Sequence, residues 1–144
     1  MSYTITARIY QCDTNTFFHV VEKTVWKFAN GGTWSEVDGA HVLTMGGSGT
    51  CGSLRLMSDT NESCIITLGV HNYRRWGDIV TNLSSDQTGV VITPEYYSDE
   101  HRDRERQREK QLTAYNVISA RGHSFAFKYT VADGSHLKVD IVIR

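Results

Sequence analysis

Apolar residues alternate with polar ones in several short runs of the chain, and a period of two is typical of strands that bury one face. Apolar side chains occupy every second position of residues 3–9, 64–70, 125–131 and 137–143. Turn signals rich in Gly, Asn and Asp separate such runs, at residues 30–32, 38–39, 46–47, 59–61 and 133–134. Short strands punctuated in this way predict a mainly β, antiparallel fold, either a sandwich or a barrel.

One segment breaks the strand pattern. Within residues 97–112, the stretch 99–110 holds five acidic and five basic residues and no β-branched residue. Ser98 or Asp99 can cap a helix here. Two oppositely charged pairs stand at helical neighbour spacings, Glu100 with Arg104 and Glu105 with Arg108. We predict a solvent-exposed helix that connects two halves of the sheet, since the acids cancel the charge that an RNA-binding helix would need.

Residues 47–52 match G-x-G-x-x-G, the phosphate-binding motif of dinucleotide folds. That motif works between a strand and a helix, whereas residues 54–56 alternate as a strand does. A P-loop is excluded because no Gly-Lys-Ser/Thr follows the glycines. A G-x-S-x-G nucleophile elbow around Ser48 is excluded because Thr50 stands where the motif requires its last glycine. The stretch therefore predicts a turn between two strands, either a simple hairpin or a loop whose bare backbone amides face a ligand.

Length and charge limit the alternatives. The chain of 144 residues is predicted to form a single domain over residues 1–144, and 40% hydrophobic content suits a globular core. A formal net charge of −1 favours neither nucleic acid nor an anionic membrane as partner. No long apolar run and no basic-then-apolar leader is found, so we expect no membrane insertion, no signal peptide and a cytoplasmic location.

Signals for catalysis or metal binding are weak. Six histidines are scattered without an H-E-x-x-H motif, and three cysteines form no C-x-x-C. Cys64 stands in an apolar strand face, where a core position is expected. Cys51, beside the glycines, is the one thiol whose setting leaves a reactive role open. We predict no metal, no cofactor and no enzymatic activity.

A second polar cluster, residues 69–83, interrupts the apolar strands. One interpretation is a loop and strand edge with Trp76 in the core and its arginines solvated. The other is a binding site for a neutral polyhydroxyl ligand, because amides, carboxylates and bare backbone pair with sugar hydroxyls and aromatic rings cover sugar C–H faces. Both interpretations stay open at the level of composition.

Four longer segments of the sequence resemble those of a known protein family, which composition alone does not reveal. They are "EKTVWKFANGGTWSE" (22–36), "VLTMGGSGTCGSLR" (42–55), "GVHNYRRWGDIVTNL" (69–83) and "REKQLTAYNV" (108–117). In this order they resemble the fungal fruit-body lectin family over essentially the whole chain. The resemblance implies a two-sheet β-sandwich joined by a helix-loop-helix connector, the architecture of sea-anemone pore-forming toxins (actinoporin-like). It also implies homotetramers and two separate sugar sites in each protomer.

The same resemblance implies the residues of both sites. The first would bind the disaccharide Galβ1-3GalNAc (the T-antigen) through Ala29, Ser48, Gly49, His71 and Asn72. The second would bind terminal N-acetylglucosamine through Asp78, Ile79, Thr81, Arg102 and Tyr115. The implied partners are glycans of glycoproteins on foreign cell surfaces, in a fungal defence role.

An actinoporin-like pore former is the alternative that the implied fold raises. Such toxins insert an amphipathic N-terminal helix into the membrane. Here strand alternation already begins at Tyr3, which favours the lectin interpretation.

Overall fold

The computed structural model describes residues 1–12, 15–26 and 31–144. Ala29, predicted in the first sugar site, lies outside the described residues. One sheet has six strands in the order β3 (Gly32–Val37), β4 (Ala40–Met45), β1 (Tyr3–Gln11), β10 (His136–Ile143), β9 (Ser124–Val131) and β8 (Ala114–Ile118). The other has four, in the order β2 (Phe18–Trp26), β5 (Thr50–Ser58), β6 (Ser63–His71) and β7 (Arg74–Val80). Three helical pieces follow β7: α1 (Gly89–Ile92), the 3₁₀ helix η1 (Thr93–Tyr97) and α2 (Arg102–Lys110).

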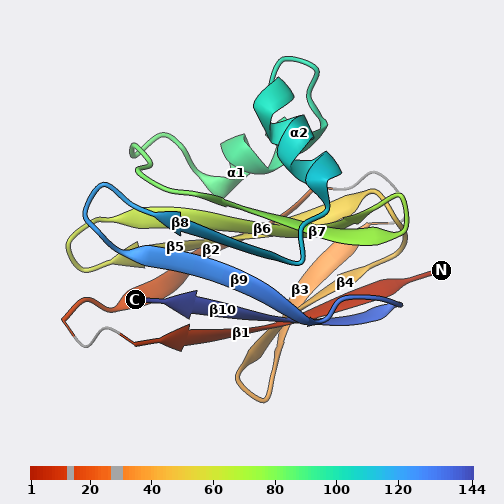
Figure 1. The fold of residues 1–144 in the computed structure, drawn as a ribbon, viewed down its shortest axis with the longest axis horizontal. Coiled ribbons are helices and arrows are strands. Elements are labelled where there is room, and N and C mark those ends of the chain that lie inside the picture. Colours follow the sequence, from red (N-terminus) through yellow and green to blue (C-terminus); the bar gives the residue numbers. More distant parts are fainter. Residues whose placement is uncertain (13–14, 27–30) are drawn as a thin grey trace.

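The two sheets pack face to face as a sandwich (Figure 1). The predicted alternation is confirmed on β10, where Leu137, Val139 and Ile141 are at most 1% exposed and their neighbours point outward. Similar inward positions on β1, β5, β6 and β9 complete one apolar core between the sheets. Val131 is the exception on β9. It is 38% exposed because a bulge shifts the β9–β10 register beside Lys138.

The prediction of a wholly antiparallel fold is wrong at one place. Strands β1 and β10 lie side by side in the centre of the larger sheet and run parallel, with Ile5 opposite Leu137. Hairpin connections force neighbouring strands to be antiparallel, but these two strands are joined only through the rest of the chain and escape that constraint. The two chain ends therefore lie at opposite ends of the sandwich (Figure 1).

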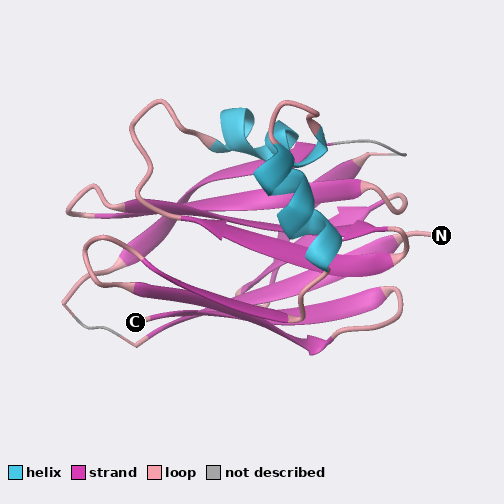
Figure 2. Cartoon of the chain, turned by 45° about the horizontal axis from the view of Figure 1, so that its top comes forward, coloured by secondary structure: helices cyan, strands magenta, loops and turns pink. Residues whose placement is uncertain are grey.

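The helical pieces cover the outer face of the smaller sheet (Figure 2). Eight of the nine residues of β6 are therefore buried, although an uncovered strand would bury only alternate ones. A second apolar cluster fills the space between this sheet and the helices: Cys51, Ile65, Trp76, Ile92 and Tyr96. The side chain of Trp76 is fully buried, as the first of the two interpretations of residues 69–83 expected.

The connector is helical as predicted, but shorter and less exposed. Helix α2 begins at Arg102, and neither Ser98 nor Asp99 caps it. Gln107 and Arg108 are buried against the sandwich, so the helix is only partly solvated. The predicted charge pairs are replaced by others, in which Arg104 pairs with Glu95 at 3.1 Å and Arg108 with Glu109 at 2.6 Å. Packing of α2 against η1 brings Glu95 within reach of Arg104, whereas Glu109 is the neighbour of Arg108 on α2 itself.

The glycine-rich turn joins two strands, as predicted, but not as a hairpin. Residues 46–49 connect β4 to β5, and these strands belong to different sheets. A strand and not a helix follows the glycines, which removes the geometry of a dinucleotide loop. The turn crosses from one sheet to the other at the end of the sandwich where β6 meets β7.

Candidate functional site

One surface depression of about 380 Å³ forms where the glycine-rich turn meets the β6–β7 hairpin and the connector. Its lining residues are Ser48, Gly49, His71, Asn72, Tyr73, Tyr97 and Arg108. We call it the first depression. Four of the five residues predicted for the disaccharide site are thus brought together from two distant stretches of the sequence, and the fifth, Ala29, is not described.

Local backbone conformation shapes the first depression. Asn72 and Tyr73 form a two-residue hairpin loop with φ of 50° and 66°, the positive values that a type I′ turn requires. The Tyr73 amide donates to Ser48 Oγ at 3.0 Å, which ties the hairpin to the glycine-rich turn. Gly49, with φ of 98°, donates its amide to the Val70 carbonyl at 2.7 Å. In this contact the Ser48 oxygen accepts, and among the described residues its hydroxyl proton stays available for a ligand.

His71 forms the polar wall of the first depression. Its Nδ1 lies 3.3 Å from the Tyr97 hydroxyl and its Nε2 lies 3.3 Å from Glu109 Oε1. Burial, with the Arg108 guanidinium as a second cause, lowers the pKa of His71 below its usual value, and Glu109 opposes that shift. The imidazole is therefore neutral at pH 7 and can accept as well as donate a hydrogen bond.

Tyr97 and Arg108 are lining residues that sequence reasoning missed. The Tyr97 ring stacks on Trp26 at 4.2 Å, and the Arg108 guanidinium lies 4.5 Å from the centre of the Tyr97 ring. Both come from the connector, which is remote in sequence from the turn and the hairpin. Only the packing of the connector on the smaller sheet brings them here, so no local pattern signals them.

A second depression, of about 480 Å³, lies between β7, β8 and α2. It is lined by Asp78, Ile79, Val80, Thr81, Asp103, Arg104, Arg106, Gln107, Lys110 and Tyr115. Four residues predicted for the N-acetylglucosamine site are thus brought together. Arg102, the fifth, is not among the lining residues and borders shallower hollows on the outer side of α2. Arg104, Arg106 and Lys110 of the same helix line the second depression.

Asp78 is the central charged group of the second depression. It is 5% exposed, and the buried Tyr96 hydroxyl donates to its Oδ2 at 2.6 Å. Burial raises the pKa of Asp78, while the hydrogen bond from Tyr96 acts in the opposite direction. The Tyr96 hydroxyl thus fixes the orientation of the carboxylate from its buried side. The lone pairs that Tyr96 does not use can accept hydrogen bonds from a ligand in the depression.

Buried hydroxyls continue inward from Tyr96. Thr67 hydrogen-bonds the Tyr96 hydroxyl, and Ser53 lies 2.7 Å from Thr67 between their oxygens. Thr93 donates to Ser53 at 2.8 Å and lies 2.8 Å from Thr24. This chain satisfies each polar group in turn, so the support of Asp78 is fixed without an unpaired buried hydroxyl.

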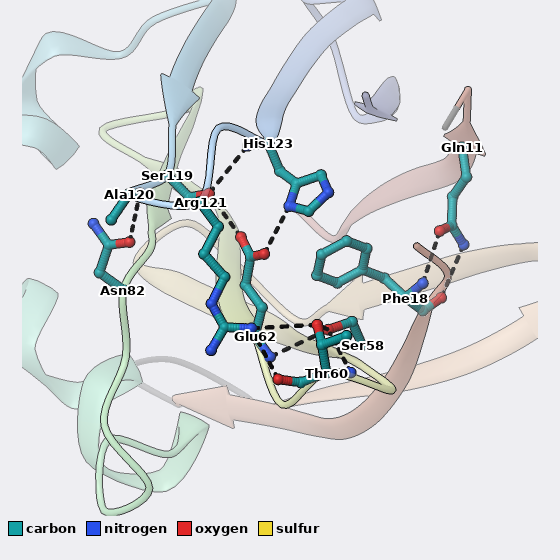
Figure 3. Close-up of polar contacts among 10 residues, drawn as sticks. All are labelled: Gln11, Phe18, Ser58, Thr60, Glu62, Asn82, Ser119, Ala120, Arg121 and His123. Carbon is teal, nitrogen blue, oxygen red and sulfur yellow. Dashed lines mark hydrogen bonds and ion pairs between the residues drawn. The ribbon is translucent and has the colours of Figure 1, made fainter. Parts of the chain in front are cut away.

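A third polar cluster lies at one end of the sandwich and holds a serine, a glutamate and a histidine (Figure 3). Glu62 accepts from Ser119 Oγ at 2.7 Å, and its other oxygen lies 2.7 Å from His123 Nδ1. The carboxylate stands between the hydroxyl and the imidazole, which is not the order of a Ser-His-acid triad, where the imidazole contacts the serine. Figure 3 also shows Arg121 reaching the Thr60 carbonyl at 2.8 Å. These contacts tie the β5–β6 turn to the β8–β9 turn and act structurally.

The described part of the chain shows no arrangement of side chains suited to metal binding or to a reactive thiol. No group of three or more His, Cys, Asp or Glu side chains there could hold a metal ion. Burial raises the pKa of the Cys51 thiol, which is fully buried, so Cys51 is a core residue and not a reactive one. No helix among the described residues has the length and apolar character to cross a membrane.

Comparisons with known proteins agree with this architecture. The model of the family described as fungal fruit body lectin matches residues 1–141. Boletus edulis lectin is 51% identical over 143 residues, which cover 99% of both chains. The crystal structure of wild-type Xerocomus chrysenteron lectin superposes with a TM-score of 0.96 at 50% identity and covers the whole of both chains. A methionine-substituted form of the same lectin gives the same TM-score at 52% identity, over 100% of this chain and 99% of that one.

A two-sheet sandwich that matches a lectin family model and has lectins as its structural neighbours over the whole chain is a carbohydrate-binding protein. The chain belongs to the fungal fruit body lectin family. The pore-forming alternative is not favoured, since the matched family and structures are lectins.

Proposed function

We propose that the protein binds Galβ1-3GalNAc in the first depression and terminal N-acetylglucosamine in the second, without altering either sugar chemically. The observation that carries this proposal is the spatial grouping of the predicted residues. Ser48, Gly49, His71 and Asn72 line one depression, and Asp78, Ile79, Thr81 and Tyr115 line another. Two groups on different surfaces support two independent sites.

The first depression offers a mixed set of donors and acceptors. The Ser48 hydroxyl and the Asn72 amide can pair with neighbouring sugar hydroxyls, and neutral His71 adds a polar wall. The exposed Tyr73 ring, 78% accessible, offers an apolar surface for a sugar C–H face. Selectivity for galactose would follow from a partner for the axial 4-hydroxyl, because an epimer leaves that partner unpaired.

The second depression combines a buried carboxylate with cations and an aromatic ring. Asp78 accepts from sugar hydroxyls, and Arg104 acts as the donor that the family resemblance had assigned to Arg102. The half-buried Tyr115 ring and the Ile79 side chain can pack on the acetyl methyl group or the sugar face. The buried support of Asp78 by Tyr96 reduces the entropy lost on binding.

The test is a crossover of two variants against two sugars by isothermal titration calorimetry. Asn72→Gly removes the amide but keeps the positive φ that alanine would adopt at a cost. It should abolish disaccharide binding and leave N-acetylglucosamine binding intact. Asp78→Asn keeps the shape of the side chain and should do the reverse. Loss of both sugars, or of neither, in either folded variant would contradict the two-site assignment.

We further propose a homotetramer, since each small ligand contributes limited affinity and several linked copies raise it by about 10² to 10⁴ through avidity. Exposed apolar residues support protomer contacts, among them Tyr10, Val21 and Val37 on strands β1 to β3. Light scattering coupled to size-exclusion chromatography should give four times the 16.3 kDa chain mass. A monomeric mass at micromolar concentration would contradict it.

We propose a cytoplasmic location and a defensive role against organisms that graze on the fungus. The free state of Cys12, Cys51 and Cys64 supports a reducing compartment. We also propose that the sandwich shares the architecture of sea-anemone pore-forming toxins, without their activity. Cell fractionation of the source fungus and feeding assays with the Asn72→Gly variant test the two statements separately.

A further inference from the structure

The basic residues of α2 form two lines on opposite sides of the helix. Five cations stand at every second position, and side chains four positions apart share a side. Arg104 and Arg108 face inward, where their guanidinium groups lie 5.9 Å and 4.5 Å from the Tyr96 and Tyr97 ring centres. The other line is exposed and consists of Arg102, Arg106 and Lys110. The outer line therefore presents positive charge to solvent.

Two members of the outer line, Arg106 and Lys110, border the second depression, and Arg104 joins them from the inner line. Against these three cations the depression holds two carboxylates, Asp78 and Asp103. Arg104 is already paired with Glu95 at 3.1 Å, so the positive rim of this depression consists of Arg106 and Lys110. A positive rim concentrates anions near it.

The two carboxylates do not neutralise that rim. Asp103 lies 2.9 Å from Arg106, but both side chains are largely exposed, at 93% and 71%, so the pair is screened by water and salt. Asp78 is buried and already accepts the Tyr96 hydroxyl. Among the described residues Lys110 acts on Asp78 through its charge, with no direct hydrogen bond or ion pair found for its ammonium group. Lys110 is thus the cation most available to a ligand.

The arrangement separates two kinds of ligand group. Asp78, on the floor, suits neutral hydroxyls and repels an anion. Arg106 and Lys110, on the helix side, suit an anion and cannot accept from hydroxyls. Both kinds of group border one depression of about 480 Å³. A ligand that satisfies both is a sugar with one negatively charged substituent.

We propose that the second depression binds N-acetylglucosamine with a sulfate or phosphate ester more tightly than it binds the neutral sugar. This inference rests on the proposed second sugar site. Lys110 and Arg106 hold the ester oxygens, and Asp78 holds the free hydroxyls. The ligand class is therefore an anionic N-acetylhexosamine at the end of a glycan.

The experiment compares neutral N-acetylglucosamine with its 3-sulfate, 6-sulfate and 6-phosphate by isothermal titration calorimetry at about 20 mM and 500 mM salt. At low salt at least one ester should bind about threefold to fivefold more tightly than the neutral sugar, and the ratio should approach one at high salt. The sulfate and phosphate arms distinguish the two possible sources of the charge.

A pair of variants locates the effect. Lys110→Gln should bring the ester-to-neutral affinity ratio close to one, whereas Lys138→Gln, the same change at an exposed position of β10, should leave the ratio unchanged. Neutral sugar binding with esters no tighter at low salt would overturn this inference and leave the proposed function standing. Binding of neither neutral sugar nor ester would overturn the proposed second site itself, and an equal loss of the ratio in both variants would overturn the role of Lys110.

Discussion

The two depressions rest on neighbouring residues of η1 but are built differently. Tyr97 touches His71 in the first, and Tyr96 donates to Asp78 in the second. The first is shaped by backbone, with positive φ at Asn72 and Tyr73 in an exposed hairpin loop. The second centres on a carboxylate in the middle of β7 with a buried hydroxyl beneath it.

Because the two depressions are built differently, ligand binding in each should depend on different interactions. A loop-built site depends on turn conformation and on contacts between loops, which are partly open to solvent. A strand-built site depends on buried hydrogen bonds, whose loss leaves an unsatisfied group in the core. Variants beneath one site should therefore spare the other, unless they disturb the layer that both share.

The largest effect is expected from Gly69→Ala, which disturbs that shared layer. A Cβ at this position would lie 2.7 Å from Cys51 Cβ and 2.7 Å from Trp76 Nε1. Both neighbours are fully buried, so the free energy of unfolding should fall by about 3 kcal/mol. Both sugars should bind more weakly. Urea denaturation measures the first effect and calorimetry the second.

Thr44→Ala, at an exposed position of β4, is the control for Gly69→Ala. It should change the free energy of unfolding by less than about 0.5 kcal/mol. If Gly69→Ala weakened only one sugar, the two depressions would not share this support.

Next in size is Tyr96→Phe, which removes the donor to Asp78. We expect N-acetylglucosamine binding about tenfold weaker and a stability loss of about 2 kcal/mol at pH 7, because a charged acceptor is left buried. The stability loss should shrink at pH 4. The hydrogen bond favours the ionised carboxylate, so its removal raises the pKa of Asp78 further, and a protonated Asp78 needs no donor.

Tyr129→Phe is the matched control, since the Tyr129 hydroxyl is also buried but donates to the Trp76 carbonyl at 2.8 Å. It should lower stability equally at both pH values and leave N-acetylglucosamine binding alone. If the loss of stability in Tyr96→Phe were the same at both pH values, the assigned role of Tyr96 as donor to Asp78 would be contradicted.

A smaller effect is expected from Tyr97→Phe on the other side of η1. The ring and its stacking on Trp26 remain, while the hydroxyl loses its contact of 3.3 Å with His71 Nδ1 and its contact with the Trp76 side chain. Disaccharide binding should weaken about twofold to threefold, with N-acetylglucosamine binding unchanged. Complete loss of disaccharide binding would mean that the Tyr97 hydroxyl contacts the sugar directly.

The smallest effect concerns the pH dependence of the first depression. The pKa of His71 is lowered by burial, so the folded protein holds this proton less tightly than the unfolded chain does. Its contribution to stability is full above about pH 6.5 and declines as pH falls through 6.5 toward the lowered pKa. Disaccharide binding should fall by about twofold from pH 7 to pH 5.5. His71→Gln should flatten that profile, and an unchanged slope would exclude His71 as its source.

Local patterns predicted the strands well but could not predict how distant strands meet. Period-two alternation marks the inward residues of β10 from sequence alone. The same alternation does not fix direction, so the parallel β1–β10 pair was missed. Residues 47–52 were likewise predicted to form a turn, but β5 already begins at Thr50, and the crossing of residues 46–49 between two sheets depends on pairing far along the chain.

The candidate sites divide in the same way. Residues inside contiguous motifs, such as Ser48, Asn72 and Asp78, could be predicted through the family resemblance. Tyr96, Tyr97 and the side of α2 that presents Arg104 in place of Arg102 depend on how the connector docks on β7. Docking is decided by packing over long sequence separations, and no local signal encodes it.

The parallel pair in the centre of the larger sheet has a consequence for synthesis of the protein. Thr4 and His136, which contact each other across β1 and β10, are 132 positions apart. While the chain emerges from the ribosome, β1 can pair with β4, but its other edge stays unpaired until β10 has been made. Folding of the larger sheet is thus a late event, and a chain without β10 would lack the strand that separates β1 from β9.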